Sequence, residues 1–144
     1  MRLTKECEYA VRCIFYLSYQ GEGIVVGRKQ IAKCMKIPDP FLGKIAQGLS
    51  RSGIIEIVQG PKGGLRLVVS PEKLTLLNVI ESVMGEIFLN DCVLRPDSCF
   101  RSPTCSIHIV WEKARDRVRQ TLGEASFAML LKNELFPPDS HDDS

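Results

Sequence analysis

The segment IPDPFLGKIAQGLSRSGIIEIVQGPKGGLRLVV (residues 37–69) decides the fold, because its pattern predicts a helix followed by a hairpin. Pro38 and Pro40 stop any helix arriving from upstream, and Pro40 suits the first turn of a new helix. Apolar residues then recur at helical spacing, namely Leu42, Ile45, Ala46 and Leu49. Gly53 stands where a helix C-cap glycine is expected. We therefore expect a helix over about residues 40–51.

The second part of this segment, residues 54–69, has the pattern of a β-hairpin. Two runs rich in β-branched residues flank GPKGG, which predicts two strands joined by a glycine-rich tip.

The residues upstream predict two further helices. Thr4 can cap a helix that begins at Lys5, and GEG (21–23) ends it. A short apolar run at 24–26 leads into a second helix over 28–35. The order helix, helix, turn, helix, hairpin is that of a winged helix-turn-helix.

The downstream half predicts a helix over 73–85 and a long helix over about 106–122. The long helix carries an apolar stripe made of Ile107, Val110, Trp111, Ala114, Val118 and Leu122. A second copy of the chain could cover this stripe, and the alternative is packing against the chain's own N-terminal helix. The predicted fold is mainly α with a small β-wing, a winged helix-turn-helix with a long C-terminal dimerisation helix. We expect a DNA-binding module at 1–70, a loop and dimerisation helix at 71–135, and a disordered tail at 136–144.

The composition is that of a soluble globular chain with an uneven charge distribution. The 144 residues are 44% hydrophobic and 25% charged, and no apolar run has membrane-spanning length. The N-terminus does not resemble a signal peptide, so we expect a cytoplasmic location. Residues 1–70 hold 11 Lys and Arg against 5 Asp and Glu, whereas residues 71–144 hold 8 against 12. A basic half suggests that this half meets a polyanion, although chance clustering of charges on solvated faces is an alternative.

A recognition helix in the DNA major groove must present polar side chains to base edges and phosphates. On the predicted helix over 40–51, Phe41 could touch a thymine methyl group, and Gln47 could read adenine. The candidate DNA-contacting residues are Arg28, Lys29, Phe41, Lys44, Gln47, Arg51, Gln59 and Lys62.

The segment CVLRPDSCFRSPTCSIH (92–108) contains three cysteines and a histidine within 17 residues. The spacing C-x6-C-x5-C-x2-H is looser than the close cysteine pairs typical of structural zinc, and it suits a larger object such as an iron–sulfur cluster. A reducing compartment disfavours a disulfide, but an empty reduced loop stays an alternative. The candidate ligands are Cys92, Cys99, Cys105 and His108. Cys7, Cys13 and Cys34 lie within predicted helices, where cysteine behaves as a small hydrophobe.

These motifs together resemble the bacterial IscR-like regulators, which are iron–sulfur-dependent winged-helix transcription factors related to nitric-oxide-sensing and cysteine-metabolism repressors. The resemblance covers about residues 1–135. It depends on the opening MRLTKECEYAVRCIFYL, the segment IPDPFLGKIAQGLSRSGII, the wing QGPKGGLRLVVSPEKLTLLNVIESVMG and the cysteine spacing. It implies a homodimer on a roughly palindromic operator and a [2Fe–2S] cluster on Cys92, Cys99, Cys105 and His108. It also implies that the iron–sulfur assembly machinery donates the cluster.

The chain departs from the family pattern at three positions. IscR has an arginine in the wing where this chain has Gln59, and an acidic recognition-helix residue where this chain has Gly43. Glu8 occupies the position at which nitric-oxide-sensing relatives place an aspartate that ligates a [4Fe–4S] cluster of the other subunit. Glu8 of a partner subunit is therefore an alternative fourth ligand to His108.

The predicted function is that of a DNA-binding repressor that senses iron–sulfur status. No nucleophile–base motif or phosphate-binding loop is visible in the sequence, so we do not expect an enzyme. The alternatives are a nitric oxide or redox sensor with a [4Fe–4S] cluster, and a regulator that uses zinc or thiol chemistry without a cluster. A small electron carrier would have no need of a basic winged module.

Overall fold

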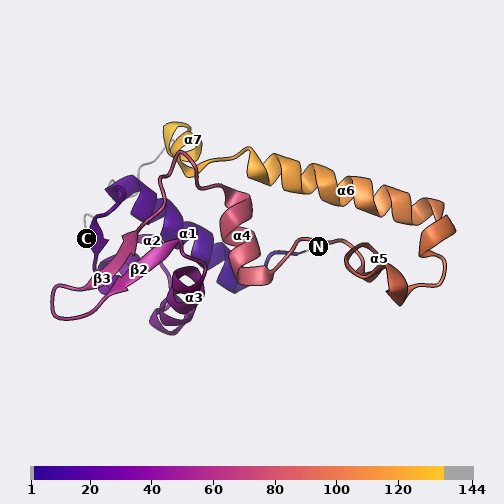
Figure 1. Cartoon of the computed structure of the whole chain (residues 1–144). Coiled ribbons are helices and arrows are strands. Elements are labelled where there is room, and N and C mark those ends of the chain that lie inside the picture. Colours follow the sequence, from indigo (N-terminus) through magenta and orange to yellow (C-terminus); the bar gives the residue numbers. More distant parts are fainter. Residues whose placement is uncertain (1, 135–144) are drawn as a thin grey trace.

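The computed structural model of the chain describes residues 2–134, so the predicted tail at 136–144 lies outside the described residues. The helices are α1 (Lys5–Gln20), α2 (Arg28–Met35), α3 (Asp39–Arg51), α4 (Leu76–Met84), α5 (Asp91–Leu94), α6 (Ser106–Gly123) and α7 (Phe127–Lys132). The strands are β1 (Val25–Val26), β2 (Ile55–Val58) and β3 (Gly64–Leu67), and two short 3-10 turns lie at Pro96–Ser98 and Ser102–Thr104. The molecule consists of a winged body and an arm, formed largely by α6, that projects from it (Figure 1).

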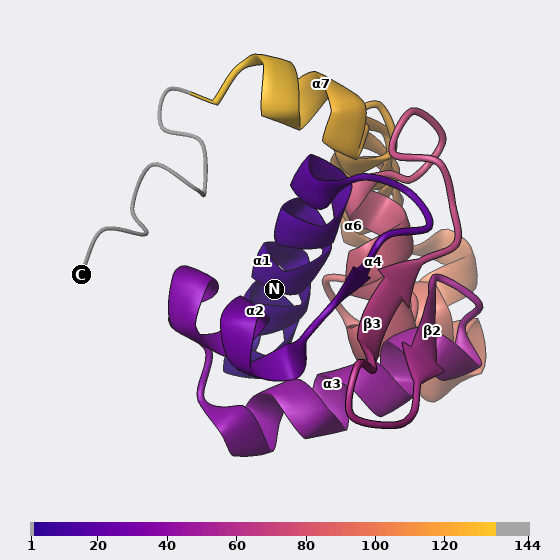
Figure 2. The ribbon, with the colours of Figure 1, turned by 90° about the vertical axis from the view of Figure 1, so that its left-hand side faces the viewer.

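Helix α1 lies at the centre of the body and contacts α2, α3, α4 and α7 (Figure 2). It begins where the sequence predicts, because the Thr4 hydroxyl accepts a hydrogen bond from the backbone N–H of Cys7. One face of α1 is fully buried in the core, with Ala10, Cys13, Ile14, Tyr16 and Leu17. Burial of these apolar groups is the main source of stability for the body.

Helices α2 and α3 form the predicted helix-turn-helix. Helix α3 begins at Asp39, one residue before the predicted start, because Pro38 takes the N-cap position in an extended conformation. Its buried residues are Leu42, Ile45, Ala46 and Leu49, as the spacing predicts. Gly53 follows the helix with a φ of 76°, the left-handed conformation expected of a residue that ends a helix.

The wing is the hairpin of β2 and β3, but the sheet has a third strand that the sequence did not indicate. The strand order is β1-β3-β2, and both pairings are antiparallel. A Cβ atom at Gly64 would overlap the carbonyl oxygen of Val26, so glycine at this position lets β1 approach β3 closely. The third strand joins residues 25–26, just upstream of α2, to the middle of β3 in the wing.

The downstream half returns to the body through α7. Helix α4 begins at Leu76, later than predicted, because Thr75 and Asn78 form a capping box. After α6 the chain folds back, Thr75 pairs with Ser126, and Phe127 is fully buried in the core around α1. Over the described residues, no helix is long and apolar enough to cross a membrane.

Candidate nucleic-acid interface and metal centre

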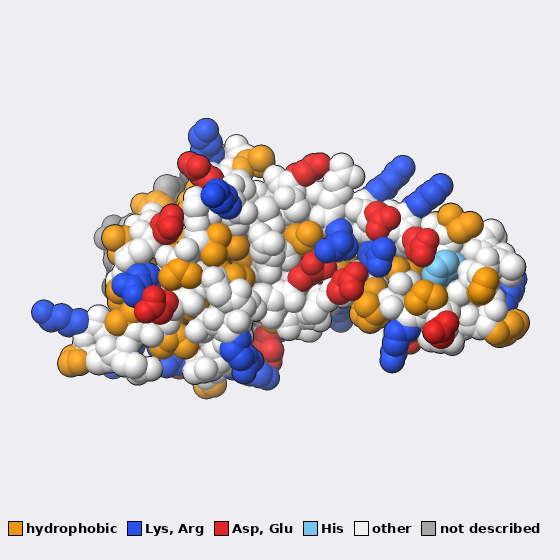
Figure 3. Space-filling model, in the orientation of Figure 1, with side chains coloured by type: hydrophobic (Ala, Val, Ile, Leu, Met, Phe, Trp, Pro, Cys, Tyr) orange, Lys and Arg blue, Asp and Glu red, His pale blue; other side chains and the backbone are white. Residues whose placement is uncertain are grey.

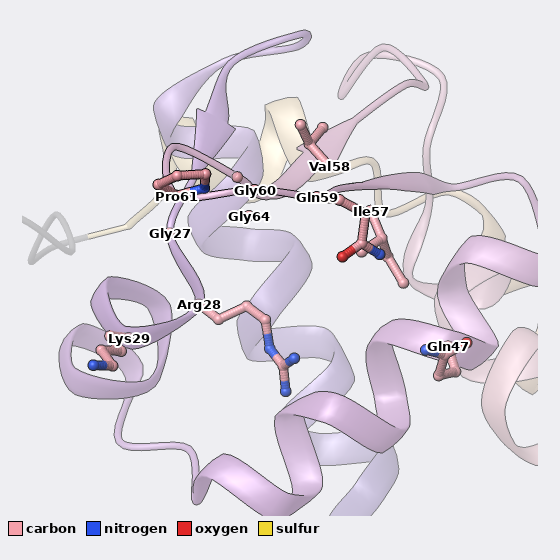
Figure 4. Close-up of a pocket in the computed structure, with 11 residues that line it drawn as sticks. Gly27, Arg28, Lys29, Gln47, Ile57, Val58, Gln59, Gly60, Pro61 and Gly64 are labelled. Atoms are coloured by element: carbon pink, nitrogen blue, oxygen red, sulfur yellow. The ribbon is translucent and has the colours of Figure 1, made fainter.

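The start of α2, the middle of α3 and the wing surround one open hollow with a volume of about 480 Å³ (Figure 4). Four predicted DNA-contacting residues line it: Arg28, Lys29, Gln47 and Gln59. The wing contributes its glycine-rich turn, so the backbone of Gly60 and Gly63 faces the same space. The hollow thus brings cations and amides from three separate segments to one surface.

Arg28 lies across α3 rather than pointing only outward from the start of α2. Its Nη2 atom is 2.6 Å from the place that a Cβ atom of Gly43 would occupy. Figure 4 shows the side chain reaching from the end of the β1 segment toward α3. The guanidinium therefore occupies the place of a side chain on α3, a placement that sequence reasoning missed because the two residues are 15 positions apart.

The other predicted contacts have different surroundings. Phe41 packs against Tyr9, with ring centroids 5.3 Å apart, and Lys44 pairs with Glu6 at 2.6 Å. Arg51 and Lys62 are exposed at the end of α3 and on the wing. Among the eight predicted residues, these four do not line the hollow.

The cysteine segment lies at the far end of the arm, beside the start of α6 (Figure 1). Two of its four predicted ligands are in contact, because the Nδ1 atom of His108 lies 3.2 Å from the sulfur of Cys92. Both residues are buried, each with only 8% of its surface exposed. Cys92 belongs to α5 and His108 to the first turn of α6, so packing of these two helices creates the contact.

The second nitrogen of His108 is also engaged. Its Nε2 atom lies 3.0 Å from the Oε1 atom of Glu112, one helical turn further along α6. The sequence carried a usable signal for this contact, since residues at i and i+4 share one face of a helix. Sequence reasoning assigned Glu112 no role.

The other two predicted ligands are more accessible: Cys99 is exposed and Cys105 is half-buried. Burial raises the pKa of the Cys92 thiol, and the electrostatic influence of the neighbouring Cys99 and Cys105 raises it further. Within the described residues, no three His, Cys, Asp or Glu side chains are gathered closely enough to hold a metal ion. The segment pairs one thiol with one imidazole and keeps two more thiols on the same short loop.

The donor set of the segment fits an iron–sulfur cluster chemically. Thiolates and imidazole are the ligands that such clusters use. Ser102, between Cys99 and Cys105, has a buried hydroxyl oxygen with no hydrogen-bond partner among the described residues. An unsatisfied buried hydroxyl costs free energy, and cluster sulfur atoms would supply an acceptor for it.

The remaining cysteines have surroundings unlike those of a metal site. Cys7 and Cys13 are fully buried in α1, and burial raises the pKa of Cys13 to about 12. Cys34 is half-buried, with its sulfur 3.5 Å from the Tyr16 hydroxyl. A thiol whose pKa lies this high is a poor metal ligand, and Cys13 acts as an apolar core residue.

Glu8, the alternative fourth ligand, lies in the first turn of α1. Its carboxylate pairs with Lys5 at 3.2 Å. Arg12, a helical neighbour that could also pair with Glu8, instead lies over the Tyr9 ring and donates to the backbone carbonyl of Met35.

The apolar stripe of α6 divides into two parts. Near the body, Val118 and Leu122 pack against a small cluster around Cys7, Ile80 and Ile87. Toward the tip, Ile107 and Val110 are 56% and 57% exposed. Figure 3 shows hydrophobic side chains gathered toward this far end, beyond a zone where acidic and basic side chains alternate.

Comparisons with known proteins agree with this architecture. The family described as Rrf2, iron-dependent transcriptional regulator, matches residues 3–133. An HTH-type transcriptional regulator of Aquifex aeolicus is 33% identical over 143 residues, covering 95% of this chain and 98% of that protein. The HTH-type transcriptional regulator NsrR of Shouchella clausii is 29% identical over 135 residues, covering 93% and 91%. The solved structure of T. potens IscR has the same fold, with a TM-score of 0.71, 21% identity and coverage of 92% and 88%.

Proposed function

Because the chain belongs to the Rrf2 family of transcriptional regulators, we propose that it is a DNA-binding repressor controlled by a [2Fe–2S] cluster in its 92–108 segment. Members of this family are winged-helix regulators and not enzymes. The identity of the cluster, the direction of regulation and the site residues are the proposed parts.

The single observation that carries the proposal is the buried contact between Cys92 and His108. It joins a thiol and an imidazole from two different helices, and Cys99 and Cys105 lie on the loop between those helices. In this proposal the four side chains are the ligands, and the iron–sulfur assembly machinery supplies the cluster. A bound cluster would provide a redox-sensitive group whose loss frees the loop.

The proposed DNA-contacting face is the hollow formed by α2, α3 and the wing, together with the exposed cations beside it. Arg28, Lys29, Gln47 and Gln59 would enter or border the groove, and Lys62 and Arg51 would meet phosphates. Phe41 and Lys44 would act from the outer side of α3 once DNA competes with Tyr9 and Glu6.

The proposed assembly is a homodimer joined along α6. The exposed part of the apolar stripe, with Ile107, Val110 and Trp111, supports a partner surface at this place. A two-fold dimer would present two wings and two α3 helices to the half-sites of a roughly palindromic operator in the cytoplasm.

A nitric oxide sensor with a [4Fe–4S] cluster is the alternative, and one observation favours it. The half-exposed Glu8 borders an open hollow with Arg2, Leu3 and Thr4, so the carboxylate is accessible to a partner subunit. Glu8 of the partner would then replace His108 as the fourth ligand.

Purification under anaerobic conditions tests the proposal. We expect a coloured protein that holds iron and sulfide in equal amounts and binds operator DNA with a different affinity after the cluster is removed. His108→Ala should change the cluster spectrum more than Glu8→Ala does, and the reverse order would favour the alternative. A colourless protein that holds zinc would overturn the cluster assignment. That result would favour a regulator that uses zinc or thiol chemistry without a cluster.

A further inference from the structure

We propose that Glu112 is a positioning residue that fixes the tautomer of His108, so that the Nδ1 atom of the imidazole faces the metal. This inference rests on the proposed function, because it names the atom through which the histidine ligand of the cluster would bind. It adds a residue that lies outside the C-x6-C-x5-C-x2-H motif.

The two nitrogens of His108 face chemically different neighbours. The Nε2 atom lies 3.0 Å from a carboxylate oxygen of Glu112, and the Nδ1 atom lies 3.2 Å from the sulfur of Cys92. An ionised carboxylate only accepts hydrogen bonds, so the proton of the neutral ring belongs on Nε2. The lone pair of Nδ1 then points toward Cys92, the first proposed ligand.

The backbone holds this arrangement in place. His108 and Glu112 are four residues apart on α6, so the helix itself sets the distance between the ring and the carboxylate. The ring is buried, with 10% of the side chain exposed, while the Glu112 side chain is 46% exposed. Glu112 therefore keeps its hydration, and among the described residues in contact with the buried ring it is the one strong acceptor for the ring N–H.

The same arrangement would strengthen the ligand. Histidines that bind metals usually donate their second ring N–H to a carboxylate or carbonyl, which orients the ring and raises its basicity. Replacing such an outer partner costs about 10- to 100-fold in metal affinity in general. Loss of the Glu112 carboxylate should therefore leave the cysteines intact and still weaken the cluster.

The first test uses the cluster-free protein with 15N-labelled histidine at about pH 8, above the ordinary histidine pKa of about 6.5. The signals of His108 are identified by their loss in His108→Ala, since the chain has two histidines. We expect a protonated Nε2 and an unprotonated Nδ1 in the wild type. Glu112→Ala should give a mixture of both tautomers, and Glu112→Gln should restore the wild-type pattern because an amide oxygen also accepts. A protonated Nδ1 in the wild type would overturn the proposal, as would an unchanged pattern in Glu112→Ala.

The second test uses the loaded protein and a matched control. We expect the cluster of Glu112→Ala to be lost to a chelator about 10-fold faster than that of the wild type, with an altered nitrogen coupling in pulsed electron paramagnetic resonance. Asp116→Ala removes another acid from α6, one that pairs with Arg115, and should behave as the wild type. Equal lifetimes and couplings in Glu112→Ala and wild type would refute the role of Glu112 alone. Failure of the wild type to hold any cluster would refute the proposed function, while the tautomer test in cluster-free protein would still stand.

Discussion

At the scale of single residues, the contact between Arg28 and Gly43 links two segments of the proposed DNA-contacting face. A glycine inside a helix costs about 1 kcal/mol of stability relative to alanine. Here the missing side chain leaves room for the Arg28 guanidinium, whose Nη2 atom is 2.6 Å from the place of the absent Cβ. The guanidinium of Arg28, a residue of α2, thus fills the place of a side chain on α3.

We expect Gly43→Ala to separate stability from DNA binding. The methyl group would displace the flexible end of Arg28, so affinity for operator DNA should fall by about 1 kcal/mol, within the range of a lost base contact. The free energy of unfolding should rise by up to about 1 kcal/mol, because alanine favours the helix. Thermal unfolding and fluorescence anisotropy with labelled operator measure the two effects.

Gly48→Ala is the matched control on the same helix. A Cβ atom at Gly48 would meet nothing within 4 Å, so this variant should gain stability and keep its affinity for DNA. If Gly43→Ala also kept its affinity for DNA, the position of the Arg28 side chain beside Gly43 would have no role in DNA binding.

Lys62 provides a second test at this scale, because it is exposed on the wing beside Pro61 and Gly63. In the proposed complex it contacts a phosphate, which carries no sequence information. Lys62→Ala should therefore weaken binding equally on specific and unrelated DNA, and lower the salt dependence by about one ion. Titrations at several salt concentrations measure this slope. A change in sequence preference would instead assign Lys62 to base reading.

Residue types in the candidate site could be predicted from the sequence more readily than their contacts. Cys92, Cys99, Cys105 and His108 lie within 17 residues, so their spacing in the sequence alone predicts a ligand set. The contact of Cys92 with His108 depends on how α5 packs against α6, which no local pattern encodes. The same limit applies to Arg28 and Gly43, because their proximity depends on how α2 packs against α3.

At the scale of elements, α4 and α6 are joined by a small group of charged side chains. Two guanidinium nitrogens of Arg119 donate to the Glu81 carboxylate at 3.0 and 3.1 Å. The backbone N–H of Ile87 donates to the same carboxylate at 2.9 Å. This group, together with the apolar cluster around Ile80, attaches the arm to the body.

We expect Glu81→Gln to destabilise the protein in a pH-dependent way. Burial by itself raises the pKa of Glu81, but the hydrogen bonds from Arg119 and Ile87 outweigh it, so the net pKa lies below its usual value. A lowered folded pKa means that the stabilisation is complete above the unfolded pKa of about 4.3 and is lost as pH falls through the folded value. The variant should be about 1–2 kcal/mol less stable at neutral pH, and the difference should shrink below about pH 4.

Denaturant unfolding of wild type and variant between about pH 3 and 7 measures this difference. Glu86→Gln is the control, since the pair of Glu86 with Arg115 spans 3.6 Å and its carboxylate is half-exposed. It should change stability less. A Glu81→Gln difference that stayed constant down to about pH 3 would contradict the lowered pKa of Glu81.

The long helices could be predicted from their periodicity and the hairpin from its glycine-rich turn, whereas α7 and β1 could not be predicted. Helices α1, α3 and α6 repeat their apolar spacing often enough to be recognised, and their observed ends differ from the predicted ends by a residue or two. Helix α7 has six residues, too few to show a period, and β1 has two. Their structure depends on distant partners: β1 pairs with β3, and Phe127 of α7 is buried beside α1.

At the scale of the whole molecule, the proposed cluster and the proposed DNA-contacting face lie at opposite ends of one chain (Figure 1). Helix α6 connects them, since its first turn carries His108 and its other end packs against the body through Val118 and Leu122. Cluster state can alter DNA affinity only if the two forms of the protein differ in how the arm holds the wings. A dimer along α6 would turn a change at the tip of each arm into a change in the spacing of the two α3 helices.

This assembly predicts that a single charged substitution on the exposed apolar stripe of α6 should both separate the subunits and weaken DNA binding. Val110→Glu places a carboxylate where a dimer would bury an apolar side chain, and Val110 is 57% exposed in the single chain, so the monomer should still fold. Sedimentation should show a monomer at concentrations where wild type is a dimer. Affinity for a full palindrome should fall by about 100-fold while affinity for one half-site stays unchanged, because the second half-site no longer binds in the same event. Gln120→Glu adds the same charge at an exposed position of α6 outside the apolar stripe and should remain dimeric. A dimeric Val110→Glu would instead mean that the subunits meet elsewhere.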